Sequence, residues 1–323
     1  GKLMVSEAKP SVYQGQNRKN FAITALLFGA SATAINPVFV RLSELDPLAS
    51  AFHRMAWALP ILWTWFYFHK RITTINSSRR SIRDRWLLIL CGLFFSADLI
   101  ALHWSIQLTA VANAILFLNA QPIYVVFGAW FLFRERPSQA FVIGSTVALL
   151  GAVFMVEQSV SFNNSRLVGD GLGILAGIFY ACFILTASRI RSHTTSAEIN
   201  LWTVSIACPF LLITSLFGGQ TIVPKSMEGW FLMVGLGVIS QALGQGLIVW
   251  GFAHLSTSFS SITLMAAPVA ASMFAWIFLG ELVSTQQILG MGMVMIGIYR
   301  CNRANIRETL SPSHQRESLD RRR

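Results

Sequence analysis

The segment LFLNAQPIYVVFGAWFLFRERPSQAFVIGSTVALLGAVFM (116–155) decides the fold, because a second segment of the chain repeats its pattern. The second segment is SITLMAAPVAASMFAWIFLGELVSTQQILGMGMVMIGIY (261–299). In and just before these segments, a shift of 146 positions aligns six identical residues of rare or special type without a gap: Trp104/Trp250, Pro122/Pro268, Trp130/Trp276, Glu135/Glu281, Gly144/Gly290 and Gly151/Gly297. Shared apolar composition does not explain these matches, so the sequence predicts an internal duplication.

Long apolar runs extend on both sides of the repeated segments. Of the 323 residues, 54% are hydrophobic and 12% charged, whereas soluble domains carry about 25% charged residues. The runs lack the charged face of a surface helix, and about 20 mostly apolar residues cross about 30 Å of hydrocarbon. We therefore predict an all-α integral membrane protein with ten transmembrane helices at 21–40, 48–68, 86–107, 110–132, 138–156, 169–188, 199–217, 228–251, 259–279 and 283–300.

The positive charge of the chain is distributed unevenly between the two sides of these spans. The formal net charge is +11. If the N-terminus is cytoplasmic, 21 of the 25 Lys and Arg residues fall on the cytoplasmic side, three on the other side, and Arg54 within a span. The positive-inside rule then predicts cytoplasmic termini and an even number of spans. Because anionic lipid accounts for the basic clusters at 79–85 and 321–323, we expect the cell (inner) membrane as location and no nucleic-acid partner.

The duplication predicts two halves of five spans each. The expected parts are a cytoplasmic tail (1–20), a first five-helix repeat (21–156), an extracytoplasmic linker (157–168), a second five-helix repeat (169–301) and a cytoplasmic tail (302–323). Since five is odd, the second half enters the membrane from the opposite side, so the repeats are inverted. Inverted repeats recur in secondary transporters, which hold substrate near the midplane between the halves. Alternating access is therefore the predicted mechanism.

The P…E…G…G pattern of both segments resembles the EamA-type transporters of the drug/metabolite transporter superfamily. LDPLASAFHRMAWA (45–58) is similar to the second span of that family, including its arginine at Arg54, and GDGLGILAGIFYACFILTASR (169–189) is similar to its sixth span. The resemblance covers about residues 21–300. It implies ten helices, cytoplasmic termini and transport of small metabolites, commonly export of amino acids or related compounds. Asp98 is not part of the family pattern.

Two of the predicted spans carry polar side chains along one face. In span 110–132 the face consists of residues three or four apart, namely Asn113, Phe117, Gln121, Tyr124 and Gly128. Gln241 and Gln245 share a face of span 228–251. Amide groups on one line do not suit a helix that faces lipid, so both faces are expected to point into the bundle. We expect the first to line a polar cavity; for the second, cavity lining and interhelical hydrogen bonding stay equally open.

Four residues of the repeated pattern are candidates for gating or hinge roles. Pro122 and Pro268 lie mid-span, where each removes a helix hydrogen bond and frees a carbonyl. A structural hinge is the favoured interpretation. Glu135 and Glu281 end their spans at opposite faces of the membrane, where a carboxylate reaches water. We favour an interfacial anchor or a gate-side salt bridge over a proton site, because a charge costs most at the bilayer centre.

Arg54 and Asp98 lie deeper in the predicted spans. Arg54 is six residues from the start of its span, and Asp98 nine from the end of the next, which corresponds to about 9 and 13 Å at 1.5 Å per residue. Neither charge suits a lipid-facing position, so each is expected to face the bundle with a partner. Two hypotheses stay open: a structural ion pair, or a site where Arg54 binds a substrate carboxylate and Asp98 an amine or a coupled proton.

The chain shows no catalytic motif, nucleotide loop or metal-ligand spacing, so no catalytic residue, cofactor or metal is predicted. The predicted function is secondary active transport, with export of a small polar metabolite such as an amino acid favoured. The expected partners are this solute and the lipid bilayer, with a proton or counter-solute as a candidate for coupling. The alternatives are an exchanger of nucleotide-like or nucleotide-sugar solutes, a channel and an intramembrane enzyme.

Overall fold

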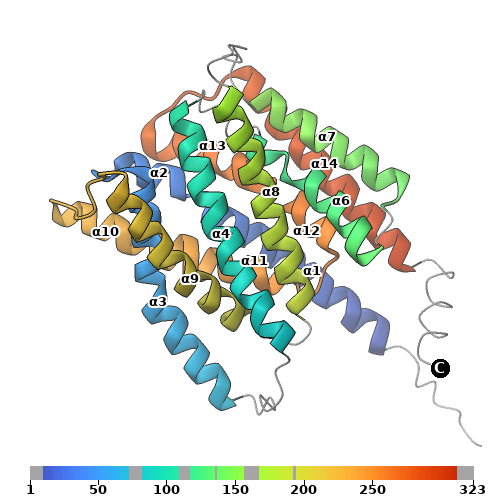
Figure 1. Ribbon diagram of the computed structural model, residues 1–323. Helices are drawn as coiled ribbons and strands as arrows, with labels where there is room; N and C mark the ends of the chain where they lie inside the picture. Colours follow the sequence, from blue (N-terminus) through green and yellow to red (C-terminus); the bar gives the residue numbers. More distant parts are fainter. Residues whose placement is uncertain are drawn as a thin grey trace, which may run out of the picture.

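The described part of the chain is built from helices. The computed structural model describes residues 10–72, 82–108, 117–134, 137–155, 167–191 and 194–310, and these ranges contain no strand. Up to residue 155 the helices are α1 (Pro10–Thr33), α2 (Asn36–Leu42), α3 (Pro47–Ile72), α4 (Ile82–Leu108), α6 (Gln121–Phe133) and α7 (Gln139–Met155) (Figure 1). After it come α8 (Leu167–Ile190), α9 (Ser196–Phe217), α10 (Met227–Gly235), the π-helix η3 (Leu236–Gln245), α11 (Gly246–Gly251), α12 (Thr257–Thr263), α13 (Ala266–Leu279) and α14 (Thr285–Leu310).

Length and composition allow many of these helices to cross a membrane. Within the described ranges, six are long and apolar enough: Lys19–Leu42, Ile82–Leu108, Leu167–Ile190, Ser196–Phe217, Met227–Gly251 and Thr257–Leu279. Phe117–Phe133 and Gln139–Met155 are shorter apolar helices. The all-helical membrane fold agrees with the sequence prediction, whereas the count of ten spans stays a prediction. Helix α14 continues to Leu310, well beyond the predicted end of its span at residue 300.

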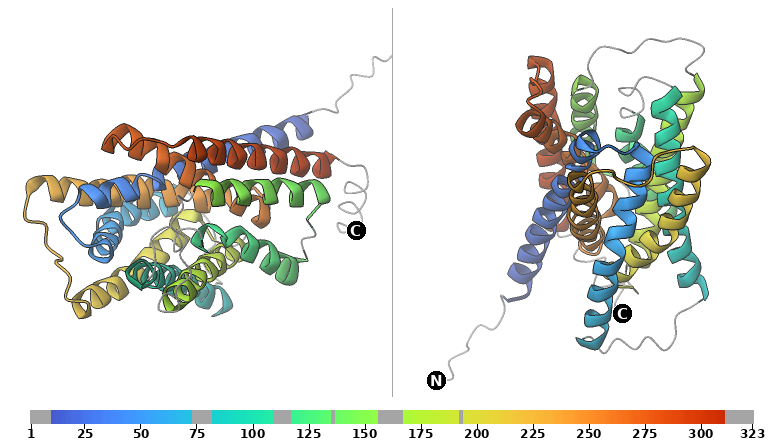
Figure 2. Two further views of the ribbon diagram at one scale, coloured as in Figure 1. Left: turned by 90° about the horizontal axis from the view of Figure 1, so that it is seen from above. Right: turned by 90° about the vertical axis from the view of Figure 1, so that its left-hand side faces the viewer.

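The helices pack as a bundle whose contacts occur in matching pairs. Seen from above, α7 and α14 lie along one side, and α4 and α8 along the opposite side (Figure 2). The contact of α4 with α8 is matched by the contact of η3 and α11 with α1. The contact of α4 with α9 is matched by the contact of η3 with α3. In the same way, the contact of α6 with α8 is matched by the contact of α13 with α1. Exchanging the first five predicted spans for the last five reproduces this set of contacts, as a duplication would predict.

The four glycines of the repeated pattern lie where α7 crosses α14. A Cβ atom on Gly151 would lie 2.6 Å from the carbonyl oxygen of Gly290, and one on Gly297 would lie 2.6 Å from that of Gly144. Any side chain at these positions would force the two backbones apart. In a bilayer, where lipid is as apolar as leucine, such close contact is a main source of helix association. These glycines therefore allow α7 and α14 to pack closely against each other.

The prolines of the repeated pattern stand just after breaks in their helices. Helix α6 begins at Gln121 after a turn at Ala120, with Pro122 in its first turn, and α13 begins at Ala266 with Pro268 in its first turn. In a first turn the missing N–H would have had no partner in any case. The predicted mid-span kinks are thus short interruptions between two helices. Pro60 and Pro209, by contrast, lie inside the continuous helices α3 and α9.

Candidate functional site

Two opposite charges are buried between α3 and α4. The side chain of Arg54 is 7% exposed and that of Asp98 is 4% exposed. The two groups interact electrostatically, and the Arg54 guanidinium lies over the ring of Phe95, 5.8 Å from its centroid. Arg54 Nε and Asp98 Oδ1 find no hydrogen-bond partner among the described residues. Each charge therefore has a compensating neighbour, while part of its hydrogen-bonding capacity is unused.

Tyr180 of α8 and Gln245 of η3 extend this pair. Tyr180 interacts electrostatically with both Arg54 and Asp98, and its hydroxyl shares a hydrogen bond with the side chain of Gln245. Gln245 is buried, and its Nε2 atom finds no partner in the described part of the chain. We call Arg54, Asp98, Tyr180 and Gln245 the buried polar cluster. Four separate helices supply it, and each belongs to a different predicted span.

The π-helix η3 brings a second amide pair close to the cluster. Gln241 Nε2 donates to Asn200 Oδ1 at 3.1 Å, and Asn200 Nδ2 donates to the backbone carbonyl of Gln241 at 3.3 Å. Both side chains are buried. Short π-helical stretches inside α-helices occur frequently at functional sites. Of the two amides predicted on this span, Gln241 thus makes an interhelical hydrogen bond, whereas Gln245 joins the charged cluster.

Sequence reasoning did not single out Tyr180 or Asn200. Tyr180 is the one residue with a polar side-chain group in the apolar stretch GIFYACF (177–183) apart from the thiol of Cys182, and Asn200 lies between Glu198 and Thr203 in EINLWTV (198–204). A polar group in a membrane helix usually indicates an interhelical contact. This signal was present in the sequence for both residues. Their partners were not readable, because the contacts join segments more than 40 positions apart.

The face predicted on span 110–132 lies against α8. Phe117 packs over Gly173, where an added Cβ would lie 3.2 Å from the Phe117 ring. Tyr124 packs over Gly177, and Gly128 over Leu185. Gln121 is buried, and its Oε1 atom finds no partner within the described ranges. The face thus points into the bundle and packs closely on a glycine-lined helix; its role in lining a cavity stays a prediction. Asn113 lies outside the described residues.

Of the two glutamates considered as gate residues, Glu281 is described and Glu135 is not. Glu281 follows α13 and forms an ion pair with Arg41, at the end of α2. Both side chains are largely exposed, at 64% for Arg41 and 47% for Glu281. The sequence allowed an interfacial anchor or a gate-side salt bridge for this glutamate; the structure shows an ion pair, and its role in gating stays a prediction.

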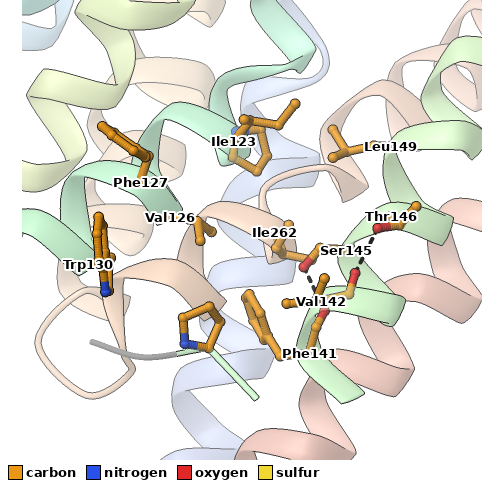
Figure 3. A pocket seen from close by; sticks show the side chains of 12 residues that line it. Ile123, Val126, Phe127, Trp130, Phe141, Val142, Ser145, Thr146, Leu149 and Ile262 are labelled. Carbon is orange, nitrogen blue, oxygen red and sulfur yellow. Dashed lines mark hydrogen bonds between the residues drawn. The ribbon is translucent and has the colours of Figure 1, made fainter. Parts of the chain in front are cut away.

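An apolar cavity of about 440 Å³ opens between α6 and α7 (Figure 3). Ile123, Phe127 and Trp130 of α6 face Val142 and Leu149 of α7 across it. Its hydroxyls belong to Ser145 and Thr146, which donate to carbonyls of their own helix. A second cavity of about 460 Å³ is lined by α4, α8 and α9. Neither lining includes a member of the buried polar cluster, so the charged chemistry and these cavities are separate.

No group of three or more His, Cys, Asp or Glu side chains that could hold a metal ion occurs among the described residues. The four cysteines (Cys91, Cys182, Cys208 and Cys301) are free thiols. The polar chemistry described above is therefore that of one guanidinium, one carboxylate, hydroxyls and amides. These groups can bind a charged or hydrogen-bonding solute, and they form none of the known nucleophile-and-base arrangements.

A bundle of long apolar helices with charges in its interior defines a multi-pass membrane protein. The sequence profile of the EamA-like transporter family matches residues 20–157 and again residues 167–302. The chain therefore belongs to the EamA-like transporter family. Family membership indicates a transporter rather than an enzyme.

Relatives of known name agree with this assignment. The chain is 23% identical over 287 residues to the pseudopaline exporter CntI of Pseudomonas aeruginosa, covering 88% of this chain and 96% of that protein. It is 25% identical over 197 residues to a Salmonella typhimurium protein named "Probable amino-acid metabolite efflux pump", covering 58% and 65%. A solved crystal structure matches with a TM-score of 0.74 at 14% identity, covering 91% of this chain and 99% of the other, and shows that the fold is shared.

Proposed function

We propose that this transporter is a secondary active exporter of an amino acid or a closely related small polar metabolite. The observation that carries the proposal is the buried polar cluster, in which a guanidinium and a carboxylate interact electrostatically inside an apolar bundle. An ion or polar group in such a place is expensive and usually functional. The cluster also has hydrogen-bonding capacity that the described residues do not use, at Arg54 Nε, Asp98 Oδ1 and Gln245 Nε2.

The chemistry of an α-amino acid complements this set of groups. Its carboxylate would accept hydrogen bonds from the guanidinium of Arg54 and from Gln245 Nε2, since a guanidinium forms the strongest hydrogen bonds with carboxylates. Its ammonium group would donate to Asp98 Oδ1. Phe95, which already lies against Arg54, offers an apolar surface for the solute side chain. The name of the Salmonella relative, which mentions amino-acid metabolites, supports the same class of solute.

Asp98 is also the group we propose for energy coupling. Because a proton and a solute ammonium compete for the same carboxylate, entry of a proton would release the solute, as exchange requires. The two halves of the bundle would expose the cluster to the two sides in turn. Two family matches in tandem, paired helix contacts and breaks before Pro122 and Pro268 support this inverted arrangement. In our proposal both termini are cytoplasmic, and residues 21–156 and 169–301 form the two repeats.

The test is transport by the purified full-length protein in liposomes. A panel of radiolabelled amino acids should include at least one that is taken up, with uptake accelerated by an imposed proton gradient. The same solute should raise the melting temperature of the protein in detergent. The matched variant is Asp98→Asn, which keeps the size of the side chain and removes its charge; it should abolish gradient-driven uptake. Uptake of nucleotide sugars in place of amino acids would contradict the proposed solute class.

A further inference from the structure

The nine residues 218–226 between α9 and α10 form a strap across one end of the bundle, and they are held to it by side chains. Gln220 Oε1 accepts a hydrogen bond from the backbone N–H of Ala49 at 3.1 Å. The Nε2 atom of the same amide lies 2.9 Å from His103 Nε2. Further along, His53 Nε2 lies 2.7 Å from the carbonyl oxygen of Ile222. The strap therefore joins α9 and α10 to the ends of α3 and α4.

The contact with Ala49 determines the orientation of the Gln220 amide. Ala49 lies in the first turn of α3, where a backbone N–H has no partner within its helix. A backbone N–H can only donate, so the atom of Gln220 that faces it must be the carbonyl oxygen. The amide NH₂ group then faces His103, and it too can only donate. His103 Nε2 must accept this hydrogen bond, which requires a neutral ring with its proton on Nδ1.

His53 holds the strap as a hydrogen-bond donor, whereas His103 acts as an acceptor. Its Nε2 atom contacts a carbonyl oxygen, which can only accept, so Nε2 carries a proton. This hydrogen bond exists whether the His53 ring is neutral or protonated. The contact between Gln220 and His103 does not have this property. Protonation would place an N–H of His103 against the NH₂ group of Gln220, and the two donors would repel each other.

Several charged groups lie around His103. Burial of the His103 ring disfavours its protonated form, and Asp46, which precedes α3 and is exposed, opposes this effect through its electrostatic interaction with the ring. Asp170 lies in the first turn of α8. This turn lies near the same end of α4, as the hydrogen bond from Ser105 Oγ to the carbonyl of Gly169 at 2.7 Å shows. On α4 itself, Asp98 lies five residues deeper, and the described C-terminal end of α9 carries no ionisable side chain. The exposed Gln107 amide also contacts His103 Nε2, at 3.0 Å.

The far end of the strap has an anchor of a different kind. Lys225 N donates to Glu44 Oε2 at 3.1 Å. Hydrogen bonds from the Ser226 side chain and from the backbone lower the pKa of Glu44 below its usual value. Because the pKa is lowered, the stabilisation from ionised Glu44 is fully present at pH values above the usual pKa of a glutamate. It is lost when the pH falls through the lowered pKa. Glu44 therefore stays ionised at about pH 5 and keeps its end of the strap in place.

We propose that His103 is a proton-sensitive latch: its protonation releases Gln220 and frees one end of the strap, while Glu44 holds the other. In our proposed topology the strap lies on the extracytoplasmic side. The effect of the latch on transport rests on the proposed function. A freed strap would let α9 and α10 move away from α3 and α4. Acid outside the cell would then favour opening toward that side.

Hydrogen–deuterium exchange of residues 218–226 in the purified full-length protein tests the latch directly. After correction for the intrinsic pH dependence of exchange, amides near Gln220 should exchange roughly tenfold faster at about pH 5 than at about pH 7.5, the change expected for loss of about one net hydrogen bond. Amides near Lys225 should stay protected. Equal exchange near Gln220 at the two pH values would overturn the proposal.

Substitutions separate His103 from the other histidines. His103→Gln cannot be protonated and should remove the pH dependence. His53→Gln should weaken the strap at both pH values while leaving the pH dependence intact, and Asp46→Asn should move the release to lower pH. His254→Gln is the matched control, because His254 contacts the carbonyl of Trp250 in its own segment. An unchanged pH response in His103→Gln would refute the assignment.

Two readouts keep the latch distinct from the transport function. If His103→Gln fails to fold, nitrogen NMR of the native protein still reports whether His103 Nε2 is unprotonated at neutral pH, as the latch requires; a protonated Nε2 would overturn it. Neither exchange nor NMR needs a solute. Failure of amino-acid uptake would therefore contradict the proposed transport function but not the latch. Amino-acid uptake by a protein whose strap does not respond to pH would contradict only the latch.

Discussion

Arg54 and Asp98 carry opposite charges into a bundle whose outer surface is apolar, and the cost of substituting one of them depends on whether the other keeps its charge. Removing one partner leaves an uncompensated buried charge, at a cost of about 3–5 kcal/mol. Removing both leaves polar but neutral side chains. The energetics of the pair can therefore be separated from its role in binding, because folding and transport respond differently to single and double substitutions.

We predict that Arg54→Gln and Asp98→Asn each fold, as judged by size-exclusion profile and melting temperature, yet lose transport of the amino-acid solute. Each single variant should lose less stability than the full cost of an unpaired buried charge, because unused polar atoms of the cluster, together with Tyr180 and Gln245, can solvate the charge that remains. The double variant should be no more active than either single one. If instead the single variants are unstable and the double variant recovers folding and transport, the pair is structural and the binding site lies elsewhere.

At the scale of elements, the contact between α7 and α14 depends on glycine. Gly151 and Gly290 bring the two backbones together, and the same holds for Gly144 and Gly297. Gly292 on α14 has no described atom within 4 Å of the position that a Cβ would occupy. The helix thus offers both a test position and a matched control one turn or less apart.

We predict that Gly290→Ala lowers the melting temperature of the purified protein, because its new Cβ would meet the carbonyl oxygen of Gly151 at 2.6 Å. Gly292→Ala should leave it unchanged or raise it slightly, since alanine is favoured over glycine in a helix by about 1 kcal/mol. Thermal denaturation in one detergent compares the two. Equal melting temperatures would show that the helices can separate at no cost, contrary to the close packing.

A second contact between elements joins α2 to the end of α13 through Arg41 and Glu281. Because both side chains are exposed, the pair should add little to stability, about 0–1 kcal/mol. We predict that Arg41→Glu alters the transport rate through like-charge repulsion with Glu281 and leaves the melting temperature nearly unchanged. Combining it with Glu281→Arg should restore the rate, because the exchange re-forms the pair. A double variant as impaired as the single one would exclude a gating role for this contact.

At the scale of the whole molecule, paired helix contacts connect the two matched halves of the chain. An inverted pair of five-span repeats requires that both chain ends lie on the same side. We predict that a reporter fused after Arg323 is active where it functions in the cytoplasm and inactive where it needs export. A reporter inserted in the strap after Gly219 should show the reverse. The same activity pattern at both positions would contradict the ten-span topology and the inverted repeat.

The hydropathy pattern, the duplication and the family resemblance were readable from the sequence, because each depends on local composition or on comparison along the chain. Length and apolar content determined where helices form, and repeated glycines indicated close helix packing. The depth of Arg54 and Asp98 followed from counting residues along two neighbouring spans. Pairing between them was one of two open hypotheses; in the structure both charges are buried and interact electrostatically, and the choice between a structural pair and a binding site stays a prediction.

Tertiary structure decided which polar side chains meet. Tyr180 and Gln245 join the charged pair from α8 and η3, and Asn200 bonds to Gln241 from α9, although the sequence showed none of these partners. The π-helical winding of η3 changes which of its side chains share a face, which no regular helical spacing anticipates. The strap likewise depends on Gln220, a loop residue, reaching Ala49 and His103 more than a hundred positions away. Hydropathy determines that a segment is buried, whereas the partner of each buried polar group is set by how distant segments pack.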